Sequence, residues 1–318
     1  MKGQSSHASS PGAIPFGVTP QRAGVLAVDI GGTKMAAAIV MADGSIVRRD
    51  RIATPQREPW TALSALVRRI HASAGEVDVR ACGVACGGPM SRNGEQVSPL
   101  HIPSWREFPL RSSLAELTGL PTFVDNDAKA LALAEGWLGA ARDVHDFIAV
   151  VVGTGVGAGL VSAGRLIDGR LGNAGHLGHM IVEVDGRECR CGAKGCLEAY
   201  LAGYAIEMET GRGATYANAA LIERNGRLLG RALAGAAALC DIRMAVVSGG
   251  VAHGWGDPFF AAATLEFEQR SRLNFTKGFE IRPAGLGGNS TLVGAAAVAF
   301  VRQRSSGINR SSGDTAPK

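Results

Sequence analysis

An apolar run followed by a glycine turn occurs twice along the chain, and this repeat limits the folds that the chain can adopt. Apolar residues 25–30 lead into a glycine turn at 31–33, and apolar residues 147–152 lead into another at 153–155. A second apolar run follows each turn, which is typical of two strands joined by a tight connection. The two units are too far apart for a solenoid repeat. Their spacing instead predicts an internally duplicated α/β fold with two similar lobes.

The glycine turns have the properties of phosphate-binding turns. Glycine lets backbone N–H groups approach an anion closely, and Thr33 and Thr154 each add a hydroxyl donor. Asp29 stands just before the first turn, where a carboxylate can bind Mg²⁺ directly or through water. A third turn, Gly249-Gly250, follows another apolar run. Closing a hairpin is the plainer role of any single turn, but three turns with one aspartate favour nucleotide binding.

Two other nucleotide-binding motifs fit less well. The Walker A pattern of P-loop kinases is absent from the sequence. Gly153, Gly155 and Ala158 formally match the dinucleotide fingerprint, but that fingerprint has to open a helix. Here the following residues alternate and reach a new turn at 162–164, which predicts a strand. The sequence therefore favours phosphate turns between strands over a Rossmann site or a P-loop.

A polar triplet, Asp125-Asn126-Asp127, precedes an Ala- and Leu-rich helix predicted over 128–138. Asn and Asp are preferred N-cap residues, so capping accounts for one of the three. A kinase that acts on a hydroxyl needs a base to take the proton as the oxygen attacks the γ-phosphorus. Asp127 suits that role, and Asn126 can bind neighbouring hydroxyls.

Three of the six cysteines lie close together in a metal-binding pattern. His179, Cys189, Cys191 and Cys196 form H-x₉-C-x-C-x₄-C. Three thiolates and one imidazole match a closed, structural tetrahedral zinc site. The polar residues between these cysteines argue against the alternative of unrelated buried thiols. The other three cysteines are expected to pack in the core: Cys82, Cys86 and Cys240.

The formal charge of +5 belongs to the two ends of the chain. Residues 1–23 hold two basic residues and no acid, and residues 301–318 hold four basic residues and one acid, so the body between them is neutral. A neutral body excludes a broad nucleic-acid-binding face. No apolar export segment follows Lys2, and the uncharged stretch 147–164 is too rich in glycine for a membrane helix. We expect a cytoplasmic protein with no nucleic-acid or membrane partner.

Together these motifs resemble those of the ROK family (repressors, open reading frames and kinases). Residues 29–34 look like its first phosphate motif, residues 153–157 like its second, and Asn126-Asp127 like its catalytic segment. The cysteine and histidine pattern looks like its zinc signature, which is highly specific. The resemblance runs from about 25 to 301. It implies an actin/hexokinase-like (ribonuclease H-like) α/β fold, duplicated into two lobes around a central cleft.

The resemblance also implies how the chain is divided and what it does. Residues 24–124 plus 291–304 would form a small α/β lobe, and residues 125–290 a large α/β lobe with the zinc motif. A flexible leader would cover 1–23 and a flexible tail 305–318. The implied activity is an ATP-dependent sugar kinase that uses Mg²⁺, carries structural Zn²⁺ and forms a homodimer.

Family members imply roles for the matching positions. Asp127 would be the base that activates a sugar hydroxyl, usually at C6, and His179 would bind zinc with one ring nitrogen while the other faces the sugar. The alternative role of Lys34 is that of a charged side chain on the face of a strand, with no part in phosphate binding. The implied sugar-binding positions are Gly88, Asn126, His176, His179 and Glu198. The implied nucleotide-binding positions are Asp29, Gly31, Gly32, Thr33, Lys34, Gly153, Thr154, Gly155, Gly249 and Gly250. The implied metal ligands are His179, Cys189, Cys191 and Cys196.

Two departures from the family pattern leave the sugar open. His176 stands where its glucose kinases usually have Glu, and His101 where they usually have Asn, and both positions lie near the sugar. Glucose, glucosamine, kanosamine and N-acetylmannosamine remain candidates, with ATP or polyphosphate as donor. The rival functions are a sugar-sensing protein without catalysis and a sugar-responsive repressor. The stretch before Asp29 is too short for the helix-turn-helix domain of a repressor, and the retained Asp29 and Asp127 argue against a sensor.

Overall fold

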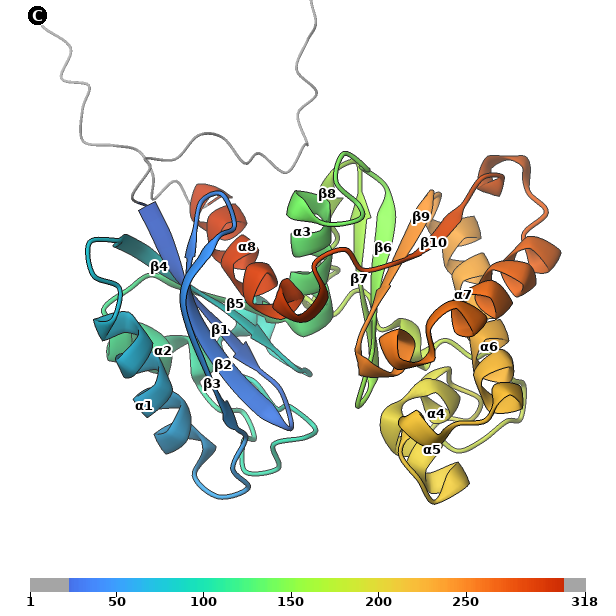
Figure 1. Cartoon of the computed structure of the whole chain (residues 1–318), viewed down its shortest axis with the longest axis horizontal. Helices are drawn as coiled ribbons and strands as arrows, with labels where there is room; N and C mark the ends of the chain where they lie inside the picture. The colour runs from blue at the N-terminus through green and yellow to red at the C-terminus, as the bar shows by residue number, and fades with distance from the viewer. Residues whose placement is uncertain (1–22, 306–318) are drawn as a thin grey trace, which may run out of the picture.

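The computed structural model describes residues 23–305 as two β-sheets with helices packed on their faces (Figure 1). The predicted leader lies outside the described residues except for Ala23, which opens the first strand, and the predicted tail lies outside them except for Ser305, which ends the last helix. Within the described part, no helix combines the length and the apolar composition that a membrane crossing requires.

The first sheet has the strand order β3-β2-β1-β4-β5. β1 pairs antiparallel with β2 and parallel with β4, which in turn pairs parallel with β5. All eight residues of β1 are buried, because helices cover both faces of this sheet. The strands are β1 (Ala23–Ile30), β2 (Lys34–Met41), β3 (Ile46–Ala53), β4 (Asp78–Cys86) and β5 (Thr122–Asn126).

Alternate residues of β1 face two different cores, as the two-residue period of a strand requires. Leu26, Val28 and Ile30 pack with α1 (Pro59–Ala72) and α2 (Leu110–Thr118). Val25 and Ala27 pack on the opposite face, against α3 (Asp127–Leu138) and α8 (Ser290–Ser305). Glycine permits the closest approach on this second face, since a Cβ on Gly83 would lie 2.0 Å from the carbonyl oxygen of Ala295.

The second sheet has the order β10-β9-β6-β7-β8 and repeats the antiparallel hairpin of the first in its β6–β7 pair. Helices α4 to α7 pack against one face, and α3 against the other. The strands are β6 (Phe147–Val152), β7 (Val156–Ser162), β8 (Arg165–Leu166), β9 (Met244–Ser248) and β10 (Glu280–Pro283). The helices are α4 (Glu198–Leu201), α5 (Gly203–Thr210), α6 (Ala219–Cys240) and α7 (Gly250–Arg270).

Helix α3 lies between the two sheets and contributes to both cores (Figure 1). At its carboxyl end the Glu135 side chain is fully buried and accepts hydrogen bonds from the backbone N–H groups of Ala140, Gly285 and Leu286. Gly285 and Leu286 belong to the segment that crosses from β10 back to α8. One buried carboxylate therefore fastens this crossing to the central helix, and a backbone donor on a charged acceptor is a strong bond.

Candidate active site and metal centre

The two predicted phosphate turns lie at matching ends of the two sheets. Residues 31–33 join β1 to β2, and residues 153–155 join β6 to β7, at the lower ends of the sheets in Figure 1. Each turn is closed by a backbone bond, from Gly31 N to the Lys34 carbonyl at 2.9 Å and from Gly153 N to the Gly155 carbonyl at 3.0 Å. Thr33 and Thr154 are exposed, so their hydroxyls remain accessible to an anion.

Asp29 is buried at the end of β1, directly before the first turn. Burial raises its pKa to about 6, although a hydrogen bond with Thr291 of α8 opposes the rise, and the charge of Asp127 adds to it while Lys34 lowers it. Two carboxyl groups that repel one another in this way favour a bound cation, because a metal ion removes the repulsion. Lys34 itself is exposed at the start of β2.

Asn126 and Asp127 form the junction between β5 and α3. Asn126 caps the helix, since its Oδ1 accepts the backbone N–H of Ala128 at 3.0 Å, and Oδ1 of Asp127 accepts the same N–H at 2.8 Å. Burial raises the pKa of the Asp127 carboxyl, against the effects of that N–H and of the charges on His101 and His176. A Cβ placed on Gly88 would lie 3.4 Å from the Asn126 side chain. Asn126 thus has the capping role as well as a place beside Gly88.

His101 and His176, the two histidines that depart from the family pattern, both lie near enough to Asp127 for their charges to act on its carboxyl. His101 lies against the first glycine turn, where a Cβ on Gly32 would come within 2.4 Å of its own Cβ. His176 is exposed, and its Nδ1 donates to the Asn173 carbonyl at 2.8 Å. The His176 ring stacks on that of His179, with the ring centroids 6.0 Å apart. Two imidazoles therefore lie close enough to Asp127 for their charges to act on its carboxyl.

Glu198 is buried at the start of α4 and holds the second glycine turn. Its Oε2 accepts the backbone N–H of Val156 at 2.9 Å and would lie 3.1 Å from a Cβ on Gly155. The turn is also fixed by Gly203 N, which donates to the Gly153 carbonyl at 2.8 Å. The carboxylate predicted to bind sugar is thus attached to the turn predicted to bind phosphate.

The third glycine turn joins β9 to α7. Gly249 has a φ of 106°, and a Cβ at this position would lie 2.1 Å from the carbonyl oxygen of Val152. Only glycine fits there without a backbone shift. Gly249 thereby brings the amino end of α7, opened by the exposed Gly250, next to the strand that leads into the second turn. The amino end of a helix attracts anions.

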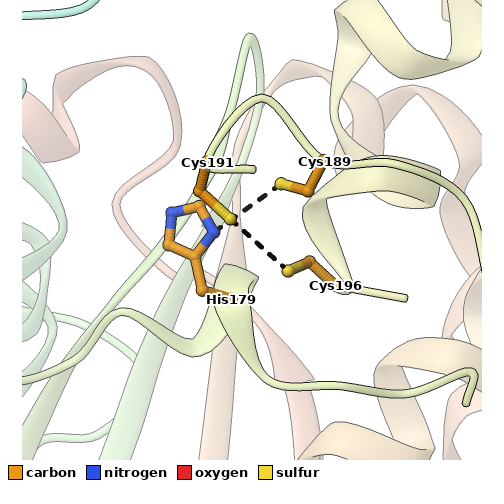
Figure 2. A group of neighbouring side chains, drawn as sticks. All are labelled: His179, Cys189, Cys191 and Cys196. Carbon is orange, nitrogen blue, oxygen red and sulfur yellow. Dashed lines mark hydrogen bonds between the residues drawn. The ribbon is translucent and has the colours of Figure 1, made fainter. Parts of the chain in front are cut away.

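His179, Cys189, Cys191 and Cys196 converge as predicted (Figure 2). His179 ends a 3-10 turn, and the cysteines come from the loop that precedes α4. Their ligand atoms all lie within 4.8 Å of one another. The separations are 3.7 Å between the sulfurs of Cys191 and Cys196 and 3.8 Å between Cys189 Sγ and His179 Nδ1. A tetrahedron with Zn–S bonds of about 2.3 Å has edges of about 3.8 Å, so this donor set fits zinc.

The loop of the metal centre depends on one glycine. Gly195 has a φ of 77°, and a Cβ there would lie 1.8 Å from the carbonyl oxygen of Glu183. Its N–H donates to the Arg187 carbonyl at 2.8 Å, and its carbonyl accepts the Val182 N–H at 2.9 Å. The two backbone bonds pair the cysteine loop with the chain that follows His179.

Some residues near the site are not indicated by any motif. Thr291 bonds Asp29 from the far end of the chain. Burial raises the pKa of the Cys86 thiol well above the usual range, and the charges of Asp127 and Asp29 add to the rise. Lys129 is almost fully buried two residues after Asp127. A lysine inside an Ala- and Leu-rich helix is a signal that sequence reasoning can use, since it requires an anionic partner.

Comparison with known proteins supports the resemblance. N-acetylmannosamine kinase of Escherichia fergusonii is 37% identical over 252 residues, which cover 72% of this chain and 84% of that protein. N-acetylmannosamine kinase of Shigella flexneri is 37% identical over 253 residues, covering 73% and 85%.

Solved structures agree on the fold. A ROK hexokinase from Thermus thermophilus has a TM-score of 0.78 and 31% identity, covering 89% of this chain and 99% of that one. A ROK family glucokinase from Streptomyces griseus, solved with glucose and AMPPNP, has a TM-score of 0.73 and 30% identity, covering 86% and 98%. The predicted actin/hexokinase-like α/β fold is confirmed. The ROK family model matches residues 25–302, and the chain therefore belongs to the ROK family.

Proposed function

We propose that this chain is an ATP-dependent kinase of a hexose or amino-hexose hydroxyl, with Asp127 as the general base. The observation that carries the proposal is the position of Asp127, a buried carboxyl with a raised pKa that is close enough to Asp29, His101 and His176 for their charges to interact. A carboxylate of raised pKa is a better proton acceptor than an ordinary one. Relatives named as N-acetylmannosamine kinases and glucokinases agree with this activity.

The reaction follows from the roles of these side chains. Asp127 takes the proton of the bound hydroxyl as its oxygen forms a bond to the γ-phosphorus. The bond from that phosphorus to the bridging oxygen breaks, and ADP leaves with the electron pair. The N–H groups of the turns at 31–33 and 153–155 would hold the phosphates, with Thr33 and Thr154 as further donors. Asp29 would hold Mg²⁺, which supplies charge neutralisation at the phosphates when bound.

The remaining predicted positions fit around this reaction. Asn126, Gly88 and Glu198 would bind sugar hydroxyls, and Gly249-Gly250 would border the adenosine. The metal ligands would hold one zinc ion, which fixes the loop that leads into α4 and therefore the place of Glu198. Nδ1 of His179 lies on the cysteine side, so Nε2 is the nitrogen that would face the sugar.

We propose N-acetylmannosamine as the first substrate to test, ahead of glucose. Curated relatives with that activity are 37% identical and are covered over 84% and 85% of their length. The glucokinase structure is 30% identical. The chain also replaces the Glu and Asn usual in the glucose kinases by His176 and His101, which changes the polar groups offered to the sugar.

A coupled ADP-release assay tests the proposal. The purified protein is given N-acetylmannosamine, glucose, mannose, glucosamine or kanosamine with MgATP or polyphosphate. Zinc content is measured on the same sample, and light scattering measures whether the protein is the homodimer that we propose. Sugar-dependent ADP release that is lost in Asp127→Asn supports the function. Equal release without sugar, or no release with any of them, contradicts it.

A further inference from the structure

A network of four charged side chains lies beside the proposed catalytic segment. Lys129 of α3 is 2% exposed, and its Nζ lies 2.9 Å from Asp125 Oδ1 and 2.5 Å from Asp168 Oδ1. Its ammonium also donates to the Gly172 carbonyl at 3.3 Å. Arg302 of α8 bonds the same two carboxylates, at 2.9 Å to Asp125 and 2.8 Å to Asp168. Each carboxylate therefore holds two cations, and the four charges cancel.

The network shifts the pKa values of Asp168 and Arg302. Burial alone would raise the pKa of Asp168, but the hydrogen bonds from Arg302 and Lys129 outweigh burial and lower it. The same bonds raise the pKa of the Arg302 guanidinium despite burial. A buried lysine without such partners would be strongly destabilising. The printed bonds thus pair each carboxylate of the network with both of its cations.

The network joins three segments that carry the proposed site. Asp125 and Lys129 are two residues on either side of Asp127, and Asp125 Oδ1 also accepts the backbone N–H of Asn126 at 2.9 Å. Asp168 belongs to the loop between β8 and the 3-10 turn at Leu177–His179, and the same loop carries His176. Arg302 belongs to α8, so the network also includes the last helix. The same four groups therefore touch the base segment and the loop of the facing sheet.

Packing alone does not hold this loop in place. A cavity of about 120 Å³ lies next to the network and is lined by its four residues, by segment 90–94 and by Gly169 and Gly172. Leu171 is half exposed, and Asn173 and His176 are exposed. The C-terminal part of the loop is fixed to β7, because the Gly175 carbonyl accepts the Ala158 N–H at 2.8 Å. Residues 168–172 are held by the ionic bonds of Asp168 and by the bond from Lys129 to the Gly172 carbonyl.

We propose that Lys129 is a positioning residue, which holds the loop 168–176 of one sheet in register with the base segment of the other. The proposal rests on the function proposed for Asp127. Buried ion networks add little to stability compared with apolar side chains of the same size, but they fix geometry. A misplacement of reacting groups by about 1 Å costs on the order of 100-fold in rate. Lys129 acts through Asp125 and Asp168 and takes no part in proton transfer.

Three variants test this role: Lys129→Met, Asp168→Asn and the double variant. The matched control is Glu266→Gln, because Glu266 is also a carboxylate held by two cations, Arg231 and Arg270, and it lies between α6 and α7. We measure kcat and KM for sugar and ATP, the thermal midpoint, and hydrogen exchange of the amides in 169–176.

We expect Lys129→Met and Asp168→Asn each to lower kcat by about 10- to 100-fold with KM for ATP changed by less than about threefold. Amide exchange in 169–176 becomes faster in both. The double variant loses less than the product of the two single losses, because both remove one interaction. Glu266→Gln lowers the thermal midpoint but leaves kcat and exchange in this loop close to those of the parent protein.

Two outcomes overturn the proposal. One is unchanged exchange in 169–176, which shows that the network does not hold the loop. The other is faster exchange with kcat within twofold of the parent, which shows that the loop position does not matter to catalysis. If the parent protein phosphorylates none of the sugars, the function proposed for Asp127 fails, and exchange alone then decides whether Lys129 holds the loop.

Discussion

The Asp127→Asn substitution separates the chemical role of this residue from its structural one. Oδ1 of Asp127 accepts the Ala128 N–H at 2.8 Å, and the amide oxygen of asparagine can accept the same bond. Asn126 accepts that N–H as well, so the start of α3 remains capped. The side chains are nearly equal in size, and the substitution removes only the charge and the basicity.

Activity and stability should change in opposite directions. General-base catalysis contributes about 10²- to 10⁴-fold in rate, so kcat should fall by that factor, or by about 3–5 kcal/mol in the activation barrier. Burial raises the pKa of Asp127, which means that folding disfavours its ionised form. At pH 7–8 the neutral asparagine avoids this cost, and the free energy of unfolding should stay the same or rise.

The assay compares steady-state kinetics with urea unfolding for Asp127→Asn and for Asp257→Asn, whose aspartate is exposed on α7. Sugar binding, followed by calorimetry, should persist in Asp127→Asn. A kcat within tenfold of the parent value refutes the assignment of the base. A lower free energy of unfolding at pH 8 refutes the argument that the buried charge is costly.

Three other perturbations give independent tests. Removal of zinc by a chelator should lower the thermal midpoint and release close to one zinc ion per chain, as measured by mass spectrometry, and Cys189→Ser should have the same effect on the midpoint. A zinc-free protein with an unchanged midpoint contradicts the structural role of the metal centre. Gly249→Ala should lower the free energy of unfolding in urea by about 2–4 kcal/mol, because Gly249 has a φ of 106° and the new Cβ meets the Val152 carbonyl. The control Gly211→Ala, with a φ of 69° and open space around the new Cβ, should lower it by about 1 kcal/mol. Folding raises the pKa of Asp29 to about 6, so the contribution of this carboxyl to stability is complete below about pH 4 and is lost as the pH rises through 6. Without bound Mg²⁺, Asp29→Asn should therefore stabilise the protein by up to about 3 kcal/mol at pH 8 and by little at pH 4. Equal effects at both pH values would show that burial of this carboxyl is not the cause.

Local patterns predicted the strands and turns that carry the site. The apolar runs before 31–33 and 153–155 are strands because their residues fill both faces of a covered sheet. The helix predicted at 128–138 begins at Asp127. The zinc ligands converge because their spacing and the glycines between them leave few other arrangements.

Contacts between residues that lie far apart in the sequence could not be predicted from such local patterns. The Asp168–Arg302 bond spans 134 residues, and nothing in the local sequence of Asp168 marks it as a member of the network with Lys129. Helix α7 was not predicted, because Pro258 and the non-helical Gly256 interrupt its pattern. Helix α6 was also not predicted, although its buried leucines recur at helical spacing. The contact of Glu198 with the second glycine turn depends on the fold of the cysteine loop, which no single motif describes.

The attachment of Glu135 to Gly285 and Leu286 affects how the two sheets can move. The backbone passes from one sheet to the other at the start of α3 and again after β10, and both passages are fastened to the same helix. Bending at one passage without the other would break a charged bond in a dry interior. For a rotation of the two sheets relative to one another, we expect α3 to be the axis, because both connections are attached to this helix. Asp127, the first residue of α3, would then move less than the glycine turns at 31–33 and 153–155.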